Sequence, residues 1–193
     1  MSQSAPASVH FSSATSDWAT PQPLFDALHR EFGFTLDVCA SKDNAKCPEF
    51  FTEEQDALHR EWRGICWMNP PYGNPEHPCK PGCTKKLCQK RGFHSAKYVP
   101  GINDFMRKAY CSAMAGATVV CLVPARPDTD WWHDWAARAT EIRFFRGRLK
   151  FGAAVNSAPF PSALVIFRTG QLCTGRVIHT RPPGLMSTGR LPL

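Results

Sequence analysis

The apolar residues of the chain follow two different patterns. In some segments they recur every three or four residues, as on one face of a helix, and in others they form continuous runs, as in a buried strand. Largely continuous apolar runs predict strands at 64–68, 117–123 and 163–167, and strands are also expected at 34–38 and 141–145, where apolar residues alternate with polar ones. Helical spacing occurs between them, at 20–32, at 101–114 and from 128 onward. Helices that alternate with apolar strands predict a mostly parallel sheet covered on both faces.

The start of the first predicted helix carries local signals. Thr20 is the expected N-cap and Pro21 the expected first helical residue, because the N–H that proline lacks would be unpaired there. Gly33 is expected to end this helix. A second, shorter helix is expected to open at Thr52, with Asp56 near its end as a solvated residue. Both helices thus flank the first predicted strand.

The residues Asn69-Pro70-Pro71-Tyr72 stop the strand 64–68 abruptly. Proline cannot continue a sheet ladder and pushes the residue before it out of the helical region, so a stiff turn is expected at the carboxyl end of the strand. Open α/β sheets place their ligands at that end. Carbonyl acceptors beside an aromatic ring suit a planar amine with two N–H groups. The alternative is an ordinary Pro-Pro turn with an Asn that caps itself.

Asp37 ends the strand 34–38 among apolar neighbours. An unpaired carboxylate in that environment is costly, so the side chain is expected to meet a partner. That partner is either a positively charged ligand group or the backbone of the following turn.

Composition and charge narrow the classes of function. The length of 193 residues fits one domain with a small appendage, and the formal charge of +7 favours a polyanionic partner. The chain has no apolar stretch of membrane-spanning length and no signal-peptide pattern, so we expect a cytoplasmic protein without a membrane partner. Its nine cysteines favour reduced thiols or metal ligation over a disulfide framework.

A basic segment without apolar periodicity, 77–97, follows the Pro-Pro turn, and we call it the basic insert. From Cys79 to Lys97 it has six Lys or Arg and no acidic residue. So polar a segment cannot build its own core, and a metal is the usual substitute. Three thiolates and one imidazole make a closed structural zinc site. The expected ligands are Cys79, Cys83, Cys88 and His94, with His77 as a substitute for His94. The other interpretation is a flexible basic loop with free thiols.

The two ends of the chain are predicted to lie outside the folded domain. Residues 1–15 are rich in Ser and Ala without periodicity, and we expect a disordered arm. Residues 169–193 contain prolines, glycines and arginines without an acid, and we expect a disordered basic tail. The predicted domain is therefore 16–168, with the basic insert inside it.

Several motifs occur in an order that resembles S-adenosylmethionine-dependent amino-methyltransferases, and most closely the small phage and prophage DNA N6-adenine methyltransferases. The resemblance covers roughly Ser16 to Arg168. It rests on Thr20-Pro21, Leu36-Asp37-Val38-Cys39-Ala40, Asp56, Asn69-Pro70-Pro71-Tyr72, Asp128-Thr129, Trp131-Trp132, Gly147-Arg148-Leu149-Lys150-Phe151 and 163–167. In one departure from the family, Cys39-Ala40-Ser41 replaces the glycine-rich turn usual after the first strand.

The resemblance implies a Rossmann-like methyltransferase sheet, mostly parallel with an antiparallel last strand, plus the small zinc-binding insert. It implies an enzyme that transfers a methyl group from S-adenosylmethionine to the N6 amine of an adenine flipped out of double-stranded DNA. The expected setting is the cytoplasm of a bacterial host, with a phage or prophage gene. A monomer is favoured.

The resemblance also implies the roles of individual residues. Asn69 and Pro70 would accept the hydrogens of the adenine amine, and Tyr72 would stack on the base. The residues implied to bind the cofactor are Trp18, Thr20, Pro21, Asp37, Ala40 and Asp56. The residues expected to contact DNA are Lys85, Lys86, Lys90, Arg91 and Arg148.

Other functions remain open at this point. The Asn-Pro-Pro-Tyr motif also serves methylation of cytosine N4, of RNA adenine and of glutamine side chains in proteins. The net charge and the basic insert favour nucleic acid over protein as substrate. A non-catalytic, zinc-bearing DNA-binding module is the alternative from another class, and cofactor binding separates it from an enzyme.

Overall fold

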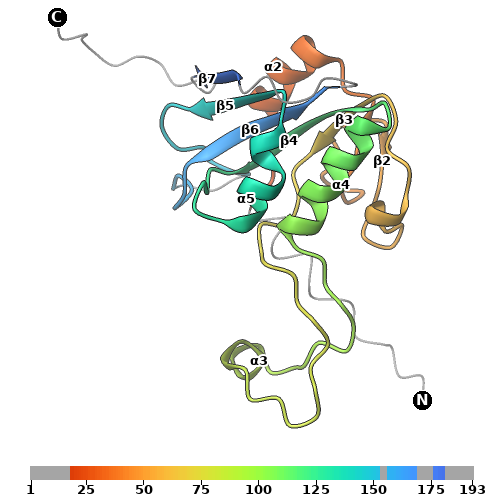
Figure 1. Cartoon of the computed structure of the whole chain (residues 1–193), viewed down its shortest axis with the longest axis vertical. Helices are drawn as coiled ribbons and strands as arrows, with labels where there is room; N and C mark the ends of the chain where they lie inside the picture. The colour runs from red at the N-terminus through yellow and green to blue at the C-terminus, as the bar shows by residue number, and fades with distance from the viewer. Residues whose placement is uncertain (1–17, 153–155, 169–175, 181–193) are drawn as a thin grey trace, which may run out of the picture.

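The computed structural model describes residues 18–152, 156–168 and 176–180, and we use the element labels of Figure 1. Seven strands form one mixed sheet in the order β2-β1-β3-β4-β6-β5-β7. The strands are β1 (Leu36–Asp37), β2 (Glu49–Phe50), β3 (Ile65–Met68), β4 (Thr118–Pro124), β5 (Glu141–Phe145), β6 (Ser162–Phe167) and β7 (Arg176–Thr180). Strand β6 pairs antiparallel with β4 and β5, whereas the other neighbours are parallel. The sheet is therefore mostly parallel, as predicted.

Helices cover both faces of this sheet. They are α2 (Gln22–Phe32), α3 (Lys86–Arg91), α4 (Ile102–Met114) and α5 (Asp130–Asp134), with two short 3₁₀ helices, η1 (Ala57–His59) and η2 (Ala136–Arg138). Helices α4 and α5 pack on one face, and α2 packs on the other. Helix α3 lies away from the sheet, at the tip of the basic insert (Figure 1).

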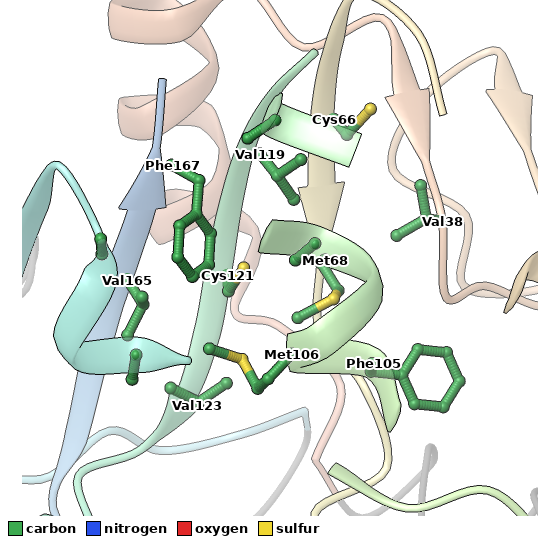
Figure 2. Close-up of a cluster of buried hydrophobic side chains, with 14 of the residues drawn as sticks. Val38, Cys66, Met68, Phe105, Met106, Val119, Cys121, Val123, Val165 and Phe167 are labelled. Carbon is green, nitrogen blue, oxygen red and sulfur yellow. The ribbon is translucent and has the colours of Figure 1, made fainter. Parts of the chain in front are cut away.

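The central strands divide their side chains between the two faces, because successive residues of a strand point in opposite directions. In β4, Val119, Cys121 and Val123 face α4, whereas Val120 and Leu122 face the side of α2. Figure 2 shows the first of these layers, in which Met106 of α4 lies over Met68, Cys121 and Val123. Residues 119–123 are fully buried, which explains why the sequence of this strand is continuously apolar.

Two predicted helix starts are wrong. Helix α2 begins at Gln22 with Pro21 at the N-cap, so Thr20 lies outside it and has no capping role. Its hydroxyl instead accepts a hydrogen bond from Asn69, a partner that local sequence cannot indicate. The helix predicted to open at Thr52 is a turn followed by η1, and Asp56 precedes η1 with a φ of 50°.

The predicted disordered tail is wrong in part. Residues 176–180 form strand β7, which extends the sheet by pairing in parallel with β5. Strand β6, the predicted last strand, is antiparallel as expected but is followed by β7. The rest of the tail and the predicted arm at 1–15 lie outside the described residues.

The basic insert leaves the fold right after the Pro-Pro turn and returns at the start of α4. Its base is closed by Glu76 and Val99, which exchange two backbone hydrogen bonds of 2.9 Å. Gly101, at the N-cap of α4, packs directly against the backbone of residues 73–75. A Cβ at Gly101 would lie 2.5 Å from the carbonyl carbon of Asn74, so only glycine allows this approach. The insert therefore has a fixed attachment next to the turn.

Candidate active site

The Asn-Pro-Pro-Tyr turn lies at the carboxyl edge of the sheet. Asn69 follows Met68, the last residue of β3, and the neighbouring strand β1 ends at Asp37. The two strands are parallel, with Asp37 opposite Trp67, so both polar residues lie at the same edge. A pocket at this edge is lined by Trp18, Thr20, Asp37, Lys46, Asn69 and Pro70, among others. We call it the Asn69 pocket.

Hydrogen bonds hold the carboxamide of Asn69 on both sides. Its Nδ2 donates to the carbonyl oxygen of Trp18 (2.8 Å) and to the hydroxyl oxygen of Thr20 (3.1 Å). Its Oδ1 accepts from the hydroxyl of Tyr72 at 2.6 Å. A carbonyl-type oxygen has two lone pairs, so Oδ1 can accept one more hydrogen bond. The side chain can thus serve as an acceptor for an amine, as the sequence predicts.

Tyr72 points its hydroxyl into the protein. The hydroxyl lies 2.6 Å from Asn69 Oδ1 and 3.3 Å from the carbonyl oxygen of Leu122 in β4. Burial is the main reason why the pKa of this phenol is raised well above its usual value, and the hydroxyl therefore remains a donor. Sequence reasoning gave Tyr72 an aromatic role alone and missed these two contacts.

The ring of Tyr72 belongs to an aromatic cluster beside the turn. Its centroid is 5.6 Å from that of Phe160, 6.3 Å from Phe151 and 6.4 Å from Trp18. Sequence analysis did not single out Phe160, which lies before β6 and is partly exposed. Such clusters form planar apolar walls. The signal that could have found it is its place just before a strand at the ligand-binding edge.

Asp37 is almost fully buried, with 3% of its surface exposed. One carboxylate oxygen accepts from the backbone N–H of Cys39 (3.2 Å) and the other from that of Lys46 (3.0 Å). Burial nevertheless raises the pKa of Asp37 from 3.8 to about 6, because these bonds and the charge of Lys46 only partly offset desolvation. The carboxylate therefore both braces the turn after β1 and faces the Asn69 pocket.

A wider groove continues from the Asn69 pocket, and Cys39 lines both. The groove is lined by Ala40 and Asp56, and also by residues 94–100, which are the end of the insert and the segment that returns from it to α4. Asp56 is exposed and pairs with Nδ1 of His59 at 2.7 Å. Within the described part of the chain it is the only non-glycine residue with a positive φ. Such strained positions concentrate at functional sites.

The predicted cofactor-binding residues therefore fall into three groups. Trp18, Thr20 and Asp37 line the Asn69 pocket, and Ala40 and Asp56 line the wider groove. Pro21 is at the start of α2 and is not among the lining residues of either.

The four predicted metal ligands of the insert come together. Potential ligand atoms of Cys79, Cys83, Cys88 and His94 all lie within 4.8 Å of one another. The sulfur of Cys88 is 3.5 Å from that of Cys79 and 3.9 Å from that of Cys83. The pKa of the Cys79 thiol is lowered to about 6, and the main cause is a hydrogen bond with His94. His77, the alternative ligand, packs instead against the ring of Tyr98.

The basic residues of the insert differ in their surroundings. Lys85, Lys86 and Lys90 are exposed. Arg91 is not, because it pairs with Glu76 at 2.8 Å and lies over the ring of Phe93. Its guanidinium is therefore engaged in contacts within the protein. Arg91 is poorly placed to make the DNA contact that was predicted for it from the sequence. Arg148, far from the insert in sequence, is exposed.

The fold and the turn together define the amino-methyltransferase class that the sequence resembles. The sequence pattern of the family described as DNA N-6-adenine-methyltransferase (Dam) matches residues 8–180 of the chain, and the chain belongs to this family. This match confirms the family predicted from the motifs.

Individual relatives match over shorter stretches. The DNA N-6-adenine-methyltransferase of Haemophilus phage HP1 is 48% identical over 61 residues, which are 30% of this chain and 35% of that protein. The DNA N-6-adenine-methyltransferase of Escherichia phage T1 is 36% identical over 62 residues, 31% of this chain and 26% of that protein. The aligned stretches thus span about a third and a quarter of these relatives.

One solved structure is also similar, the type I restriction-modification system methyltransferase subunit from Streptococcus thermophilus. It is 14% identical, with a TM-score of 0.44 over 90% of this chain and 49% of that one. This similarity is too low to add to the family assignment. Within the described residues, no helix is long and apolar enough to cross a membrane.

Proposed function

We propose that this protein transfers a methyl group from S-adenosylmethionine to the N6 amine of an adenine in double-stranded DNA. The observation that carries the proposal is the fixed carboxamide of Asn69, whose Oδ1 keeps one free lone pair at the carboxyl edge of the sheet. Membership of the DNA N-6-adenine-methyltransferase family supports it. The sheet is then a Rossmann-like methyltransferase sheet.

The exocyclic nitrogen of adenine is a poor nucleophile, because its lone pair is delocalised into the ring. Hydrogen bonds from this amine to Asn69 Oδ1 and to the carbonyl of Pro70 concentrate electron density on the nitrogen. The base leaves the duplex to reach the turn and lies against the ring of Tyr72. Most of the rate enhancement then comes from positioning. No strong base is required, because the methylated ammonium product is acidic enough to release its proton to water.

The residues at the sheet edge fit the cofactor. Bound S-adenosylmethionine supplies an electrophilic methyl group on a sulfonium ion. The buried carboxylate of Asp37 suits a cationic amino group in the Asn69 pocket, and the exposed carboxylate of Asp56 suits an amine donor in the adjoining groove. The chain lacks the glycine-rich turn of the family, but the groove is open at this place, where Cys39 and Ala40 line it instead.

The basic insert fits a structural zinc ion. In a tetrahedral site with Zn–S bonds of about 2.3 Å, neighbouring sulfurs are about 3.8 Å apart. The sulfur–sulfur distances of 3.5 and 3.9 Å around Cys88 match this spacing, and His94 supplies the fourth donor. Three soft thiolates and an imidazole select zinc over hard cations. In this proposal the zinc replaces the hydrophobic core that the insert lacks.

The zinc-bound insert gives the proposed DNA substrate a second contact. Lys85, Lys86 and Lys90 are exposed at and around α3, on a lobe that starts beside the catalytic turn. Lysines at such positions bind phosphates without selecting bases, so they hold DNA near the turn irrespective of sequence. Arg148 adds an exposed charge from the main domain.

The test is methylation of defined duplex DNA by the purified full chain, with S-adenosylmethionine, followed by mass spectrometry of the nucleosides. N6-methyladenine is expected for the wild type. We expect Asn69→Ala to abolish it while the cofactor dissociation constant stays within a few fold. Asn74→Ala, which changes an exposed asparagine five residues away, is the matched control and should retain activity.

Three outcomes would contradict the proposal in whole or in part. Methylation of cytosine N4 instead of adenine N6 would assign the turn to another base. Cofactor binding without methylation of any nucleoside would remove DNA as substrate. Turnover of Asn69→Ala at a tenth of the wild-type rate or more would remove Asn69 from the reaction.

A further inference from the structure

The hydrogen bonds of Asn69 and Tyr72 join three separate parts of the chain. The carbonyl of Trp18 and the hydroxyl of Thr20 come from the segment before α2, and the hydroxyl of Tyr72 comes from the turn itself. That hydroxyl also lies 3.3 Å from the carbonyl of Leu122 in β4. Thr20 is almost fully buried, with 5% of its surface exposed. The carboxamide is thus held by the tertiary structure, and β3 alone does not orient it.

The orientation of the carboxamide follows from the chemistry of its partners. The carbonyl of Trp18 can only accept a hydrogen bond, so the atom beside it must be the amide nitrogen Nδ2 of Asn69. Rotating the amide by 180° would put two carbonyl oxygens against each other. Both Nδ2 hydrogens are therefore used internally, one on Trp18 and one on Thr20. Only Oδ1 is left for a ligand.

We propose that the hydroxyls of Thr20 and Tyr72 are positioning groups that lock the Asn69 carboxamide with Oδ1 toward the target amine. This inference rests on the proposed function, because it assigns a purpose to the same turn. It gives Thr20 a role different from the cofactor contact implied by the family resemblance. It also gives the hydroxyl of Tyr72 a role separate from stacking by the ring.

The hydroxyls of Thr20 and Tyr72 are suited to positioning because neither of them ionises at working pH. The pKa of Tyr72 is raised by burial, so this hydroxyl stays protonated and donates to Asn69 Oδ1. Thr20 accepts through its oxygen and does not ionise. An acceptor that is already oriented avoids the loss of rotamer freedom when the amine binds.

The first test compares Thr20→Val with Thr20→Ser. Valine has nearly the shape of threonine but no hydroxyl, whereas serine keeps the hydroxyl. For Thr20→Val we expect kcat to fall by about two- to tenfold, the range for one lost hydrogen bond. The cofactor dissociation constant should stay within twofold, and Thr20→Ser should recover most of the lost rate. A weaker cofactor affinity with unchanged kcat in Thr20→Val would return Thr20 to the cofactor site.

The second test uses Tyr72→Phe, which keeps the ring and removes the hydroxyl. We expect a loss of kcat of about the same size, with DNA affinity unchanged because the stacking surface remains. The two variants should not combine additively, because both release the same carboxamide. A double variant whose loss equals the product of the single losses would contradict a shared action on Asn69. Tyr72→Phe also keeps the inference testable if Thr20→Val does not fold.

A third measurement needs no enzymatic activity. The two Nδ2 hydrogens of Asn69 should exchange slowly with water, as observed by NMR of protein labelled with ¹⁵N-asparagine and assigned by comparison with Asn69→Ala. Exchange should be faster in Thr20→Val and unchanged in Thr20→Ser. Unchanged exchange in Thr20→Val would refute the lock. If the wild type does not methylate DNA but shows this protection, the proposed function fails and the lock stands.

Discussion

Lowering the pH from about 8 to about 5 should weaken cofactor binding, because Asp37 changes from a carboxylate to a neutral acid in that range. Its pKa is raised to about 6 by burial, against the partial compensation of two backbone hydrogen bonds. A cationic group of the cofactor next to Asp37 would favour the ionised form. Binding below pH 6 must therefore first remove a proton, and the dissociation constant should rise by up to about tenfold for each pH unit below that value.

The raised pKa of Asp37 also affects the stability of the ligand-free protein. Because the folded state holds the Asp37 proton more tightly than the unfolded chain does, this group's effect on stability is most favourable below about pH 4. The stability then declines as the pH rises to about 6. A pKa difference of about two units corresponds to about 3 kcal/mol at most. The free protein thus carries a destabilising carboxylate at neutral pH, and a cationic ligand relieves that cost.

Isothermal titration of the cofactor between about pH 5 and pH 8 measures the effect, with Asp37→Asn as the matched variant. The wild type should show the pH-dependent affinity, and the variant should bind weakly with little pH dependence. A flat profile in the wild type, or the same profile in Asp37→Asn, would refute the role of Asp37 in cofactor binding. Thermal unfolding of both proteins over the same range checks that each is folded.

Three further predictions concern the insert and its attachment. Replacing Lys85, Lys86 and Lys90 together by Ala should weaken binding of all DNA sequences alike and lower the salt slope by about 0.9 for each lost phosphate contact. Metal analysis should find one zinc per chain in the wild type, and Cys83→Ser should release it and loosen DNA binding, but spare cofactor binding, because the insert adds little to the α/β core. Gly101→Ala should lower the free energy of unfolding by about 1–3 kcal/mol, because its Cβ would collide with the backbone of residues 73–75.

Each of these variants has a control in the chain. Arg30→Ala with Arg107→Ala removes exposed charges from α2 and α4 and should leave the salt slope unchanged. Cys111→Ser changes an exposed cysteine outside the cluster and should retain the zinc. Gly73→Ala has free space for a Cβ and should be near neutral. If the wild type holds no stoichiometric zinc, the insert is a basic loop with free thiols. If the salt slope is unaltered by the lysine changes, Lys85, Lys86 and Lys90 do not contact DNA.

The sequence alone was enough for the alternation of helices and strands, the turn after β3 and the metal-ligand cluster. These features depend on residues close together in the chain. Apolar periodicity reports which face of an element is buried, and two prolines end a strand wherever it lies. The metal ligands span only 79–94, and a short polar segment has few ways to be stabilised. Spacing left open whether His94 or His77 is the fourth candidate ligand, and the fold brings His94 to the three cysteines while His77 packs against Tyr98.

Only the tertiary structure decided which atoms meet at the turn. Thr20 looks like a helix cap in sequence, but its hydroxyl accepts from Asn69, 49 residues away. Arg91 looks like one more DNA-binding charge, but Glu76 neutralises it. A short hydroxyl or a guanidinium can satisfy its hydrogen bonds with many partners, and propensity does not choose among them. That choice is made when the sheet order brings distant segments to one edge, which is why the sequence predicts the acceptor but not the groups that hold it in place.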